Sequence, residues 1–305
     1  MVIGDLHCDL PYKVYKFGKT LDNYDLQWSL NYVAENNSFI QVFATCVEDD
    51  EELNSFNGAS LVINRFKKQL EKFNVFVSAN SFSENKVNAI LSLEGASALQ
   101  GEIGNVQKFY DMGVRLITLT WNYENELGFG AVTGIKKGLK PFGREVIKEL
   151  NRLKMAVDVS HLNEEGFWDA CELSEIPVIA SHSNSKSLCD NPRNLTDSQF
   201  VAIKNKGGIV GLNVYPPFLN NTQNAVIKDI INHLEHFLAL GGEDTVCFGC
   251  DFDGIDVTAK NFENISYYSD FINELLKLNF PEKLIAKICC ENMKNYFNQY
   301  IFEFF

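Results

Sequence analysis

Short apolar runs rich in β-branched residues recur along the chain, and eight of them are typical of strands that are buried on both faces. They are predicted at residues 2–6, 39–45, 89–93, 116–120, 156–160, 177–181, 208–213 and 245–250. Most of the segments between them carry the apolar spacing of helices, as in 59–70 and 227–238. Strands that alternate with helices form a parallel sheet, and eight such units predict a (β/α)8 barrel of the TIM type.

The boundaries between these elements agree with one continuous domain. Asn163-Glu-Glu-Gly and Thr196-Asp-Ser-Gln are typical helix starts, the second with the form of a capping box. No linker, low-complexity tract or repeat interrupts the pattern, so residues 1–305 are predicted to form a single domain. The acidic stretch 47–58 is expected to be a loop. The tail 262–305 is expected to add C-terminal helices that pack on the outside of the barrel or against a partner chain, which is compatible with a homodimer.

Composition and charge exclude several classes of protein. The 46% hydrophobic and 22% charged residues are ordinary for a soluble globular protein, and the net charge of −13 without a basic stretch argues against nucleic-acid and anionic-membrane partners. No apolar run reaches the roughly 18 residues of a membrane helix. Asp5 stands where a secretory signal would be basic, so a cytoplasmic location is expected. In that compartment the eight cysteines are expected to stay reduced. Cys247 and Cys250 are expected to be small packed residues on opposite faces of a strand.

Polar side chains follow the predicted strands at the points where they end. His7 and Asp9 come after the first strand, and because alternate residues of a strand share a face, both are expected to point one way and Cys8 the other. An Asp that caps the next helix beside an incidental His is the alternative. The later strands end in Glu94, His161, His182, Asp251 and Asp253. Barrel enzymes carry their chemistry at this C-terminal rim, which predicts a site there.

Three histidines and several carboxylates at one rim predict a two-metal site in which Glu94 is the natural bridge. Two ions about 3.5–4 Å apart can share a hydroxide and clamp a carbonyl oxygen, and zinc lowers the pKa of bound water to about 7. Asp251 would then be free to exchange a proton or to anchor a substrate ammonium. Asp253 is the weaker candidate, since it shares a face with Asp251 but could only cap the loop at Gly254. The remaining histidines, His233 and His236, lie mid-helix and are expected to have no role in the site.

A series of motifs, in order over nearly the whole chain, resembles the membrane (renal) dipeptidase family, metal-dependent dipeptidases within the amidohydrolase-like barrels. They are D-L-H-C-D (5–9), L-S-L-E-G (91–95), V-D-V-S-H (157–161), I-A-S-H-S (179–183), Arg193-Asn194 eleven residues after His182, G-C-D-F-D-G (249–254) and E-N-M-K-N-Y-F (291–297). The resemblance implies two zinc ions per chain. It also implies hydrolysis of dipeptides with a free C-terminal carboxylate, often with tolerance of a D-residue at that position.

The resemblance also assigns roles to individual residues. It implies two ligand sets that share one residue: His7, Asp9 and Glu94 for one ion, and Glu94, His161 and His182 for the other. Asp251 is implied to be catalytic, and Arg193, with Asn194 beside it, is implied to hold the substrate carboxylate. Two places depart from the family pattern. Trp121 stands where the family has a His that helps to hold the substrate or the tetrahedral intermediate, so oxyanion stabilisation is expected to rest on the metals or on Asn122. The family's G-G-H-S after the Glu is missing here, which leaves the substrate preference open.

Three hypotheses remain from the sequence. The leading one is a dinuclear zinc dipeptidase in which a metal-bridging hydroxide attacks the peptide bond and Trp121 forms an apolar wall beside it. The second is another amidohydrolase acting on an N-acyl amino acid, a lactone or a phosphoester; Arg193 discriminates, because a planar guanidinium suits a free carboxylate. The third is a metal-stabilised barrel that binds peptides without cleaving them, which Trp121 supports and the intact Asp251 opposes.

Overall fold

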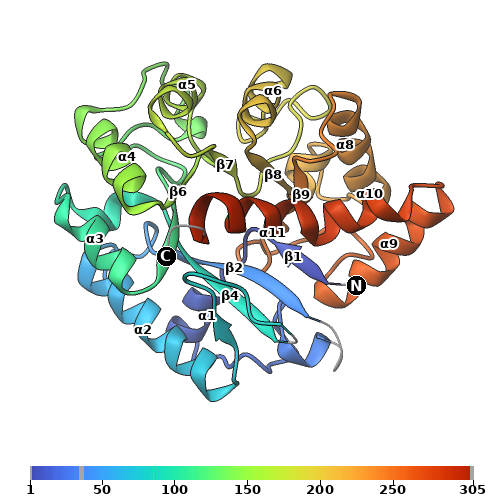
Figure 1. Ribbon diagram of the computed structural model, residues 1–305, viewed down its shortest axis with the longest axis horizontal. Helices are drawn as coiled ribbons and strands as arrows, with labels where there is room; N and C mark the ends of the chain where they lie inside the picture. The colour runs from blue at the N-terminus through green and yellow to red at the C-terminus, as the bar shows by residue number, and fades with distance from the viewer. Residues whose placement is uncertain (1, 34–37, 85, 303–305) are drawn as a thin grey trace.

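The computed structural model describes residues 2–33, 38–84 and 86–302. Its centre is a closed parallel barrel, which confirms the predicted (β/α)8 class (Figure 1). The barrel strands are β1 (Ile3–Asp5), β2 (Phe39–Cys46), β4 (Val87–Glu94), β5 (Val114–Thr118), β6 (Ala156–Asp158), β7 (Ile179–Ala180), β8 (Ile209–Leu212) and β9 (Val246–Phe248). They pair in the order β2-β1-β9-β8-β7-β6-β5-β4, and the pairing of β2 with β4 closes the ring.

One further strand was not expected from the sequence. β3 (Phe76–Val77) pairs with β4 at Asn88 and Ala89, below the point where β5 joins the same strand. The helices are α1 (Leu10–Lys16), α2 (Phe56–Lys72), α3 (Gly104–Asp111), α4 (Pro141–Leu153), α5 (Glu164–Leu173), α6 (Asp197–Lys206), α7 (Pro216–Leu219), α8 (Ile227–Ala239), α9 (Tyr268–Lys277), α10 (Glu282–Ala286) and α11 (Asn292–Tyr296). Short 3₁₀ turns span Leu30–Tyr32, Ala96–Leu99, Ala131–Thr133 and Ile265–Tyr267.

Local sequence accounts for several of these boundaries. Asn163 caps α5 through Gly166 N–H, and Thr196 with Gln199 forms the predicted capping box of α6. The acidic loop after β2 ends three residues before its expected end, because the Ser55 side chain caps α2 through Gly58 N–H.

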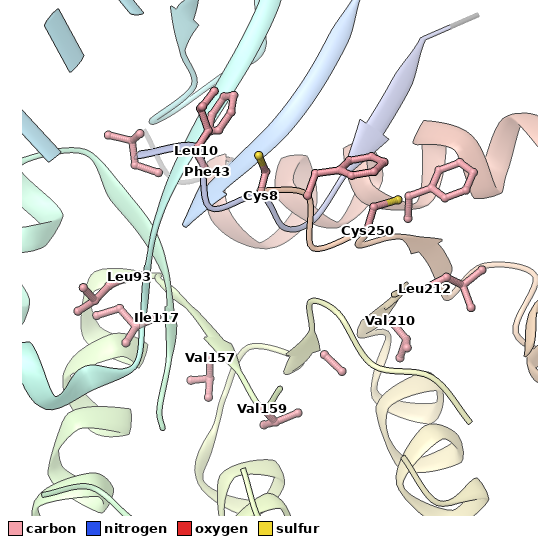
Figure 2. Packing of buried hydrophobic residues seen from close by; sticks show 14 of the residues in the cluster. Cys8, Leu10, Phe43, Leu93, Ile117, Val157, Val159, Val210, Leu212 and Cys250 are labelled. Atoms are coloured by element: carbon pink, nitrogen blue, oxygen red, sulfur yellow. The ribbon is translucent and has the colours of Figure 1, made fainter. Parts of the chain in front are cut away.

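Two apolar layers fill the inside and the outside of the ring because strand residues alternate between its faces. Figure 2 shows part of the outer layer, in which strand side chains pack toward the helices; its members include Leu93, Ile117, Val157, Val210 and Leu212. The inner layer includes Ile40, Ile90, Leu116, Ala156 and Ile209. Cys250 belongs to the outer layer and Cys247 to the inner one, so the two cysteines lie on opposite faces as predicted.

The C-terminal helices correct the expectation that the whole tail packs on the outer wall or on a partner. After α10 the chain continues as one nearly unbroken helix, with π-helical turns at Lys287–Glu291 and Phe297–Phe302, that crosses the ring of strands (Figure 1). Met293 and Phe297 pack into the inner apolar layer. Asn292 donates to the carbonyl of Val246, where β9 begins. The helix therefore covers the N-terminal mouth of the barrel and leaves the opposite rim open.

Candidate metal centre

The side chains at the C-terminal rim are aimed by the way each strand ends. Glu94 is the last residue of β4, whereas His161 and Asp251 follow β6 and β9 in the left-handed backbone region, with φ of 67° and 66°. Non-glycine residues adopt this region uncommonly, and such residues often occur at functional sites. The turned backbone directs both side chains over the barrel mouth, whereas in an extended strand successive side chains alternate between the two faces of the barrel wall.

Glu94 lies at the centre of three imidazoles. Its Oε2 is 3.3 Å from His7 Nε2, and its Oε1 is 3.0 Å from His161 Nε2 and 3.5 Å from His182 Nε2. The two histidines that share Oε1 bring their own Nε2 atoms to within 2.8 Å of each other. Each carboxylate oxygen thus faces a different set of nitrogens, which is the geometry of a bridging ligand.

Asp9 completes the group around the other oxygen. It occupies the N-cap position of α1, but its side chain makes no capping hydrogen bond within the described chain, so the alternative of a simple capping Asp is wrong. Its Oδ2 instead lies 3.4 Å from His7 Nε2. His7 Nε2 and Asp9 Oδ1 are both buried, and neither finds a hydrogen-bond partner among the described residues. Buried polar atoms without partners are costly, and a cation between them satisfies both.

Three overlapping groups of ligand atoms meet the distance limits of a metal site, each within 4.8 Å. They are His7, Asp9 and Glu94; Glu94, His161 and His182; and His7, His182 and Asp251. The imidazole and carboxylate donors fit a divalent transition metal such as zinc.

Burial and mutual charge shift the pKa values of these groups in opposite directions. Burial opposes the charge of His7, but the carboxylates of Glu94 and Asp9 outweigh it and raise its pKa well above the usual value. Burial likewise opposes the charge of Glu94, and His7 and His161 outweigh it to hold that pKa well below its usual range. Burial, with Arg193 nearby, lowers the pKa of His161 to about 3. His161 is therefore neutral at physiological pH, the form in which an imidazole can bind a metal.

The Trp121–Asn122 segment lies against His161. Asn122 Oδ1 is 3.0 Å from His161 Nδ1, so that nitrogen donates its hydrogen and Nε2 keeps its lone pair toward Glu94. The sequence hypothesis gave Asn122 a role at the oxyanion, whereas in the structure its oxygen orients the His161 ring. The Trp121 ring centre is 6.2 Å from that of His161, and Trp121 forms part of the cavity wall.

Arg193 reaches the centre from the loop after β7. Its side chain is buried, its Nη2 lies 2.9 Å from His182 Nε2, and its guanidinium carbon lies 5.4 Å from the centre of the Phe218 ring. Burial lowers the pKa of Arg193 to about 10, so the group stays cationic. Asn194 differs from the expectation of substrate contact. Its Oδ1 accepts from Asn184 N–H, and its Nδ2 donates to two backbone carbonyls, so its amide holds the Arg193 loop in place.

The two aspartates after β9 point in different directions. Asp251 Oδ2 accepts from Asn213 Nδ2 at 3.0 Å, and its Oδ1 is 3.9 Å from His7 Nε2. Burial raises the pKa of Asp251 to about 6. Asp253 also has a positive φ, and its carboxylate accepts the N–H groups of Gln27 and Trp28. The prediction that it shares a face with Asp251 is therefore wrong, because the backbone between them is not extended.

The two histidines that were predicted to have no role in the site both have other partners. His233 is buried outside the rim, where Nδ1 accepts from Ser185 N–H and Nε2 donates to the Leu219 carbonyl. His236 pairs with Asp197. Asn213 was missed, although a polar residue directly after the apolar strand 209–212 is the same signal that identified the others.

A cavity of about 390 Å³ opens above the cluster, a size that suits a small ligand. Its floor includes Asp9, Glu94, His161 and Asp251. Its sides include Tyr12, Lys13, Asp49, Trp121, Tyr215, Phe218, Ile255 and Asp256. The arrangement places potential metal ligands, a carboxylate with a raised pKa and an aromatic wall in one concave site.

No helix in the described ranges is both long enough and apolar enough to cross a bilayer. The family model for membrane dipeptidases (peptidase family M19) matches residues 1–300. An uncharacterized dipeptidase of Schizosaccharomyces pombe is 35% identical over 216 residues, which cover 70% of this chain and 53% of that protein. An uncharacterized protein in the pqqA 5′ region of Klebsiella pneumoniae is 36% identical over 231 residues, or 71% of this chain and 85% of that protein. The chain thus spans about half the length of the yeast relative. A metallopeptidase from Rhodobacter sphaeroides, solved with a phosphinate mimic of the dipeptide L-Ala-D-Ala, has the same fold, with a TM-score of 0.88 and 24% identity over 99% of both chains.

Proposed function

The chain belongs to the membrane dipeptidase family (peptidase family M19), and from that premise we propose that it is a metal-dependent hydrolase that cleaves dipeptides with a free C-terminal carboxylate at a site for two zinc ions. One observation carries the proposal. The two oxygens of Glu94 face different imidazoles, with His7 on one side and His161 with His182 on the other. A single ion needs only one such set, so the split supports two sites that share the carboxylate.

In this proposal five side chains would hold the ions: His7, Asp9, Glu94, His161 and His182. Zinc bound there supplies a water of lowered pKa and polarises the scissile carbonyl. Asp251 is close enough to the cluster to exchange a proton with the reacting groups, and its raised pKa, about 6, lies near the operating pH of a general acid–base group.

Arg193 provides recognition of the substrate carboxylate. Its Nη2 is held by His182 Nε2, and its Nε has no hydrogen-bond partner in the ranges that the structure covers. When His182 Nε2 binds an ion, it no longer accepts from Arg193, and the guanidinium can donate to a new acceptor. A planar guanidinium matches a carboxylate in two parallel hydrogen bonds, which supports a substrate with a free C-terminus. Trp121 would line the cavity beside the peptide bond and favour small or apolar side chains.

Tolerance of a D-residue at the C-terminal position is part of the same proposal. The R. sphaeroides metallopeptidase that shares this fold binds a mimic of L-Ala-D-Ala. The test is to load the purified protein with zinc, count the ions by mass spectrometry of the metal, and measure hydrolysis of L-Ala-D-Ala and L-Ala-L-Ala beside their C-terminal amides.

We expect about two ions per chain and a kcat/KM about 10–150-fold lower for the amides, which corresponds to the loss of about 1.5–3 kcal/mol of charged hydrogen bonding. Equal kcat/KM for acid and amide would refute carboxylate recognition and favour a broader amidohydrolase. A protein that holds its ions but hydrolyses no dipeptide, N-acyl amino acid, lactone or phosphoester would refute catalysis and favour a peptide-binding barrel.

A further inference from the structure

Glu48 is a carboxylate near the barrel rim that the proposed reaction does not use. It follows the end of β2, and the residues on either side of it line the cavity whereas Glu48 does not. Its Oε1 instead accepts Ser97 N–H and Asn125 Nδ2, each at 3.1 Å. The Glu48 side chain therefore lies behind the cavity wall, between the turn after β4 (95–97) and the segment after β5 (121–125).

The amide of Asn125 is fixed in the orientation that serves Glu48. Its Oδ1 accepts the backbone N–H groups of Leu127 and Gly128, at 2.9 and 3.2 Å. The NH₂ group is thereby turned the other way, where it donates to Glu48 and to the carbonyl of Leu119. The Asn125 side chain could not turn its NH₂ group away from Glu48 without losing these contacts.

The backbone after β4 leaves room for this carboxylate. Gly95 has a φ of 77°, and a Cβ atom placed on it would lie 2.5, 2.6 and 2.7 Å from Glu48 Cδ, Oε1 and Cγ. Glycine adopts a positive φ without a steric cost, and here it also lets the side chain approach the backbone closely. Burial raises the pKa of Glu48, and hydrogen bonds from Asn125, from the turn after β4 and from the Trp121 backbone oppose this shift. Donors from both segments thus surround the carboxylate.

Both places at which the chain departs from the family pattern lie against Glu48. Ser97 belongs to the stretch after β4 that lacks G-G-H-S, and Trp121 stands where the family has a His. On the opposite side, Trp121 and Asn122 form part of the cavity wall. Glu48 is therefore a contact that joins the two departures from behind the wall.

We propose that Glu48 is a positioning residue that fixes the place of Trp121 and thereby sets which substrate side chains the cavity accepts. It holds the Trp121 end of the segment against the turn after β4, so the indole stays at the cavity wall. The other end of the segment is held separately by Lys140, whose Nζ donates to the Asn125 carbonyl at 2.6 Å. Loss of the Glu48 carboxylate should therefore shift the indole without releasing the whole segment, and it should widen the cavity for larger side chains. The selectivity in this inference rests on the proposed function, whereas the place of Trp121 is a property of the chain itself.

Fluorine NMR of protein labelled with 5-fluorotryptophan tests the position of the indole directly. The chain has three tryptophans, and Trp121→Phe identifies the Trp121 signal. We expect Glu48→Ala to shift or broaden that signal and to leave those of Trp28 and Trp168 as in the wild type. Glu51→Ala is the matched control, since it removes an exposed carboxylate from the same loop. An unmoved Trp121 signal in Glu48→Ala, or the same change in the control, would overturn the inference.

The second readout is the selectivity between L-Ala-L-Ala and dipeptides that carry phenylalanine at either position. A hydrophobic pocket typically discriminates between side chains of different size by about 10–200-fold. Glu48→Ala should reduce the preference for the small dipeptide by about tenfold, through a lower KM for the larger ones, while kcat for L-Ala-L-Ala and the zinc content stay close to the wild type. In Trp121→Ala the preference is already lost, so adding Glu48→Ala should not change it further. A purely structural role would instead lower kcat for all substrates and add to the effect of Trp121→Ala.

The two readouts separate failure of this inference from failure of the proposed function. A protein that cleaves no dipeptide refutes the proposed function, and the Trp121 signal then still decides whether Glu48 places the wall. A Trp121 signal that moves while the selectivity of an active enzyme stays unchanged would overturn the role in specificity. If Glu48→Ala does not fold, Glu48→Gln decides, because it keeps the size of the side chain but removes the charge that strengthens its hydrogen bonds. A wild-type Trp121 signal together with wild-type selectivity in that variant would overturn the inference.

Discussion

Replacing Asp251 with asparagine separates a proton-transfer role from a metal-ligand role. The change is nearly isosteric, and asparagine tolerates the positive φ of 66° as aspartate does. Asn213 Oδ1 is fixed by Tyr215 N–H, so Asn213 Nδ2 can still donate to the oxygen that the new side chain retains. The substitution thus removes a negative charge and a proton acceptor while the surrounding hydrogen bonds persist.

The expected effects on stability and on turnover have opposite signs. Because burial raises the pKa of Asp251 from 3.8 to about 6, its ionised form opposes folding of the metal-free protein at neutral pH by up to about 3 kcal/mol. The variant should therefore melt at the same temperature or higher without metal. Loss of a general acid–base group typically costs about 10²–10⁴-fold in kcat, or roughly 3–5 kcal/mol in the activation barrier.

The assay measures kcat on a good dipeptide substrate, the number of bound ions and the melting temperature of the metal-free protein. Asp256→Asn removes the same charge from the exposed rim of the cavity and should keep most of kcat, since solvent screens that carboxylate. If Asp251→Asn retained near-full kcat, the proton-transfer role would be wrong. If it lost an ion, Asp251 would act through the group it forms with His7 and His182, as a ligand.

Three further predictions address the ligands, the guanidinium and a histidine away from the site. His161→Ala and His182→Ala should each lower the zinc content by about one ion per chain, as counted by metal mass spectrometry; full occupancy in both would contradict the assignment. Arg193→Lys should raise KM for dipeptides about 10–150-fold with a smaller change in kcat, because an ammonium cannot copy the paired hydrogen bonds; an unchanged KM would exclude the carboxylate contact. Burial lowers the pKa of His233 below 6.5, so the unfolded chain takes up the proton first. The stabilisation that comes from a neutral His233 is therefore present above pH 6.5 and is lost as the pH falls below it. His233→Gln should make the melting temperature depend less on pH in this range. An equal slope of melting temperature against pH in the wild type and the variant would refute the account.

The sequence predicted the barrel well because its strands are buried on both faces. Such strands read as unbroken apolar runs, and all eight were located, whereas β3 has only two half-buried residues and no pattern to detect. The surface against which the last helix packs could not be predicted from the sequence either. The apolar side chains around Met293 and Phe297 pack into the mouth of the ring, and that surface exists only once the strands have closed.

The sequence predicted which residue types lie at the rim, but it predicted only partly the directions in which their side chains point. Counting alternate residues along an extended strand works for His7 and Asp9, which meet as expected. It fails after β9, where Asp251 and Asp253 both have positive φ and no periodicity applies. The buried Ser181 hydroxyl donates to Asp158, and this hydrogen bond joins two strands and two motifs, V-D-V-S-H and I-A-S-H-S. In the sequence, its available sign was a polar residue at a strand position that faces inward.

The position of β1 between β2 and β9 has a consequence for the order in which the chain folds. Asp5 accepts hydrogen bonds from Gln41 and from Cys250, and the second partner lies 245 residues away in the sequence. During synthesis the first strand therefore has one neighbour early and waits for almost the whole chain before it gains the other. Contacts of such long sequence separation form late and leave apolar edges exposed in the meantime. Chaperone demand should accordingly persist until β9 has been synthesised and has paired with β1.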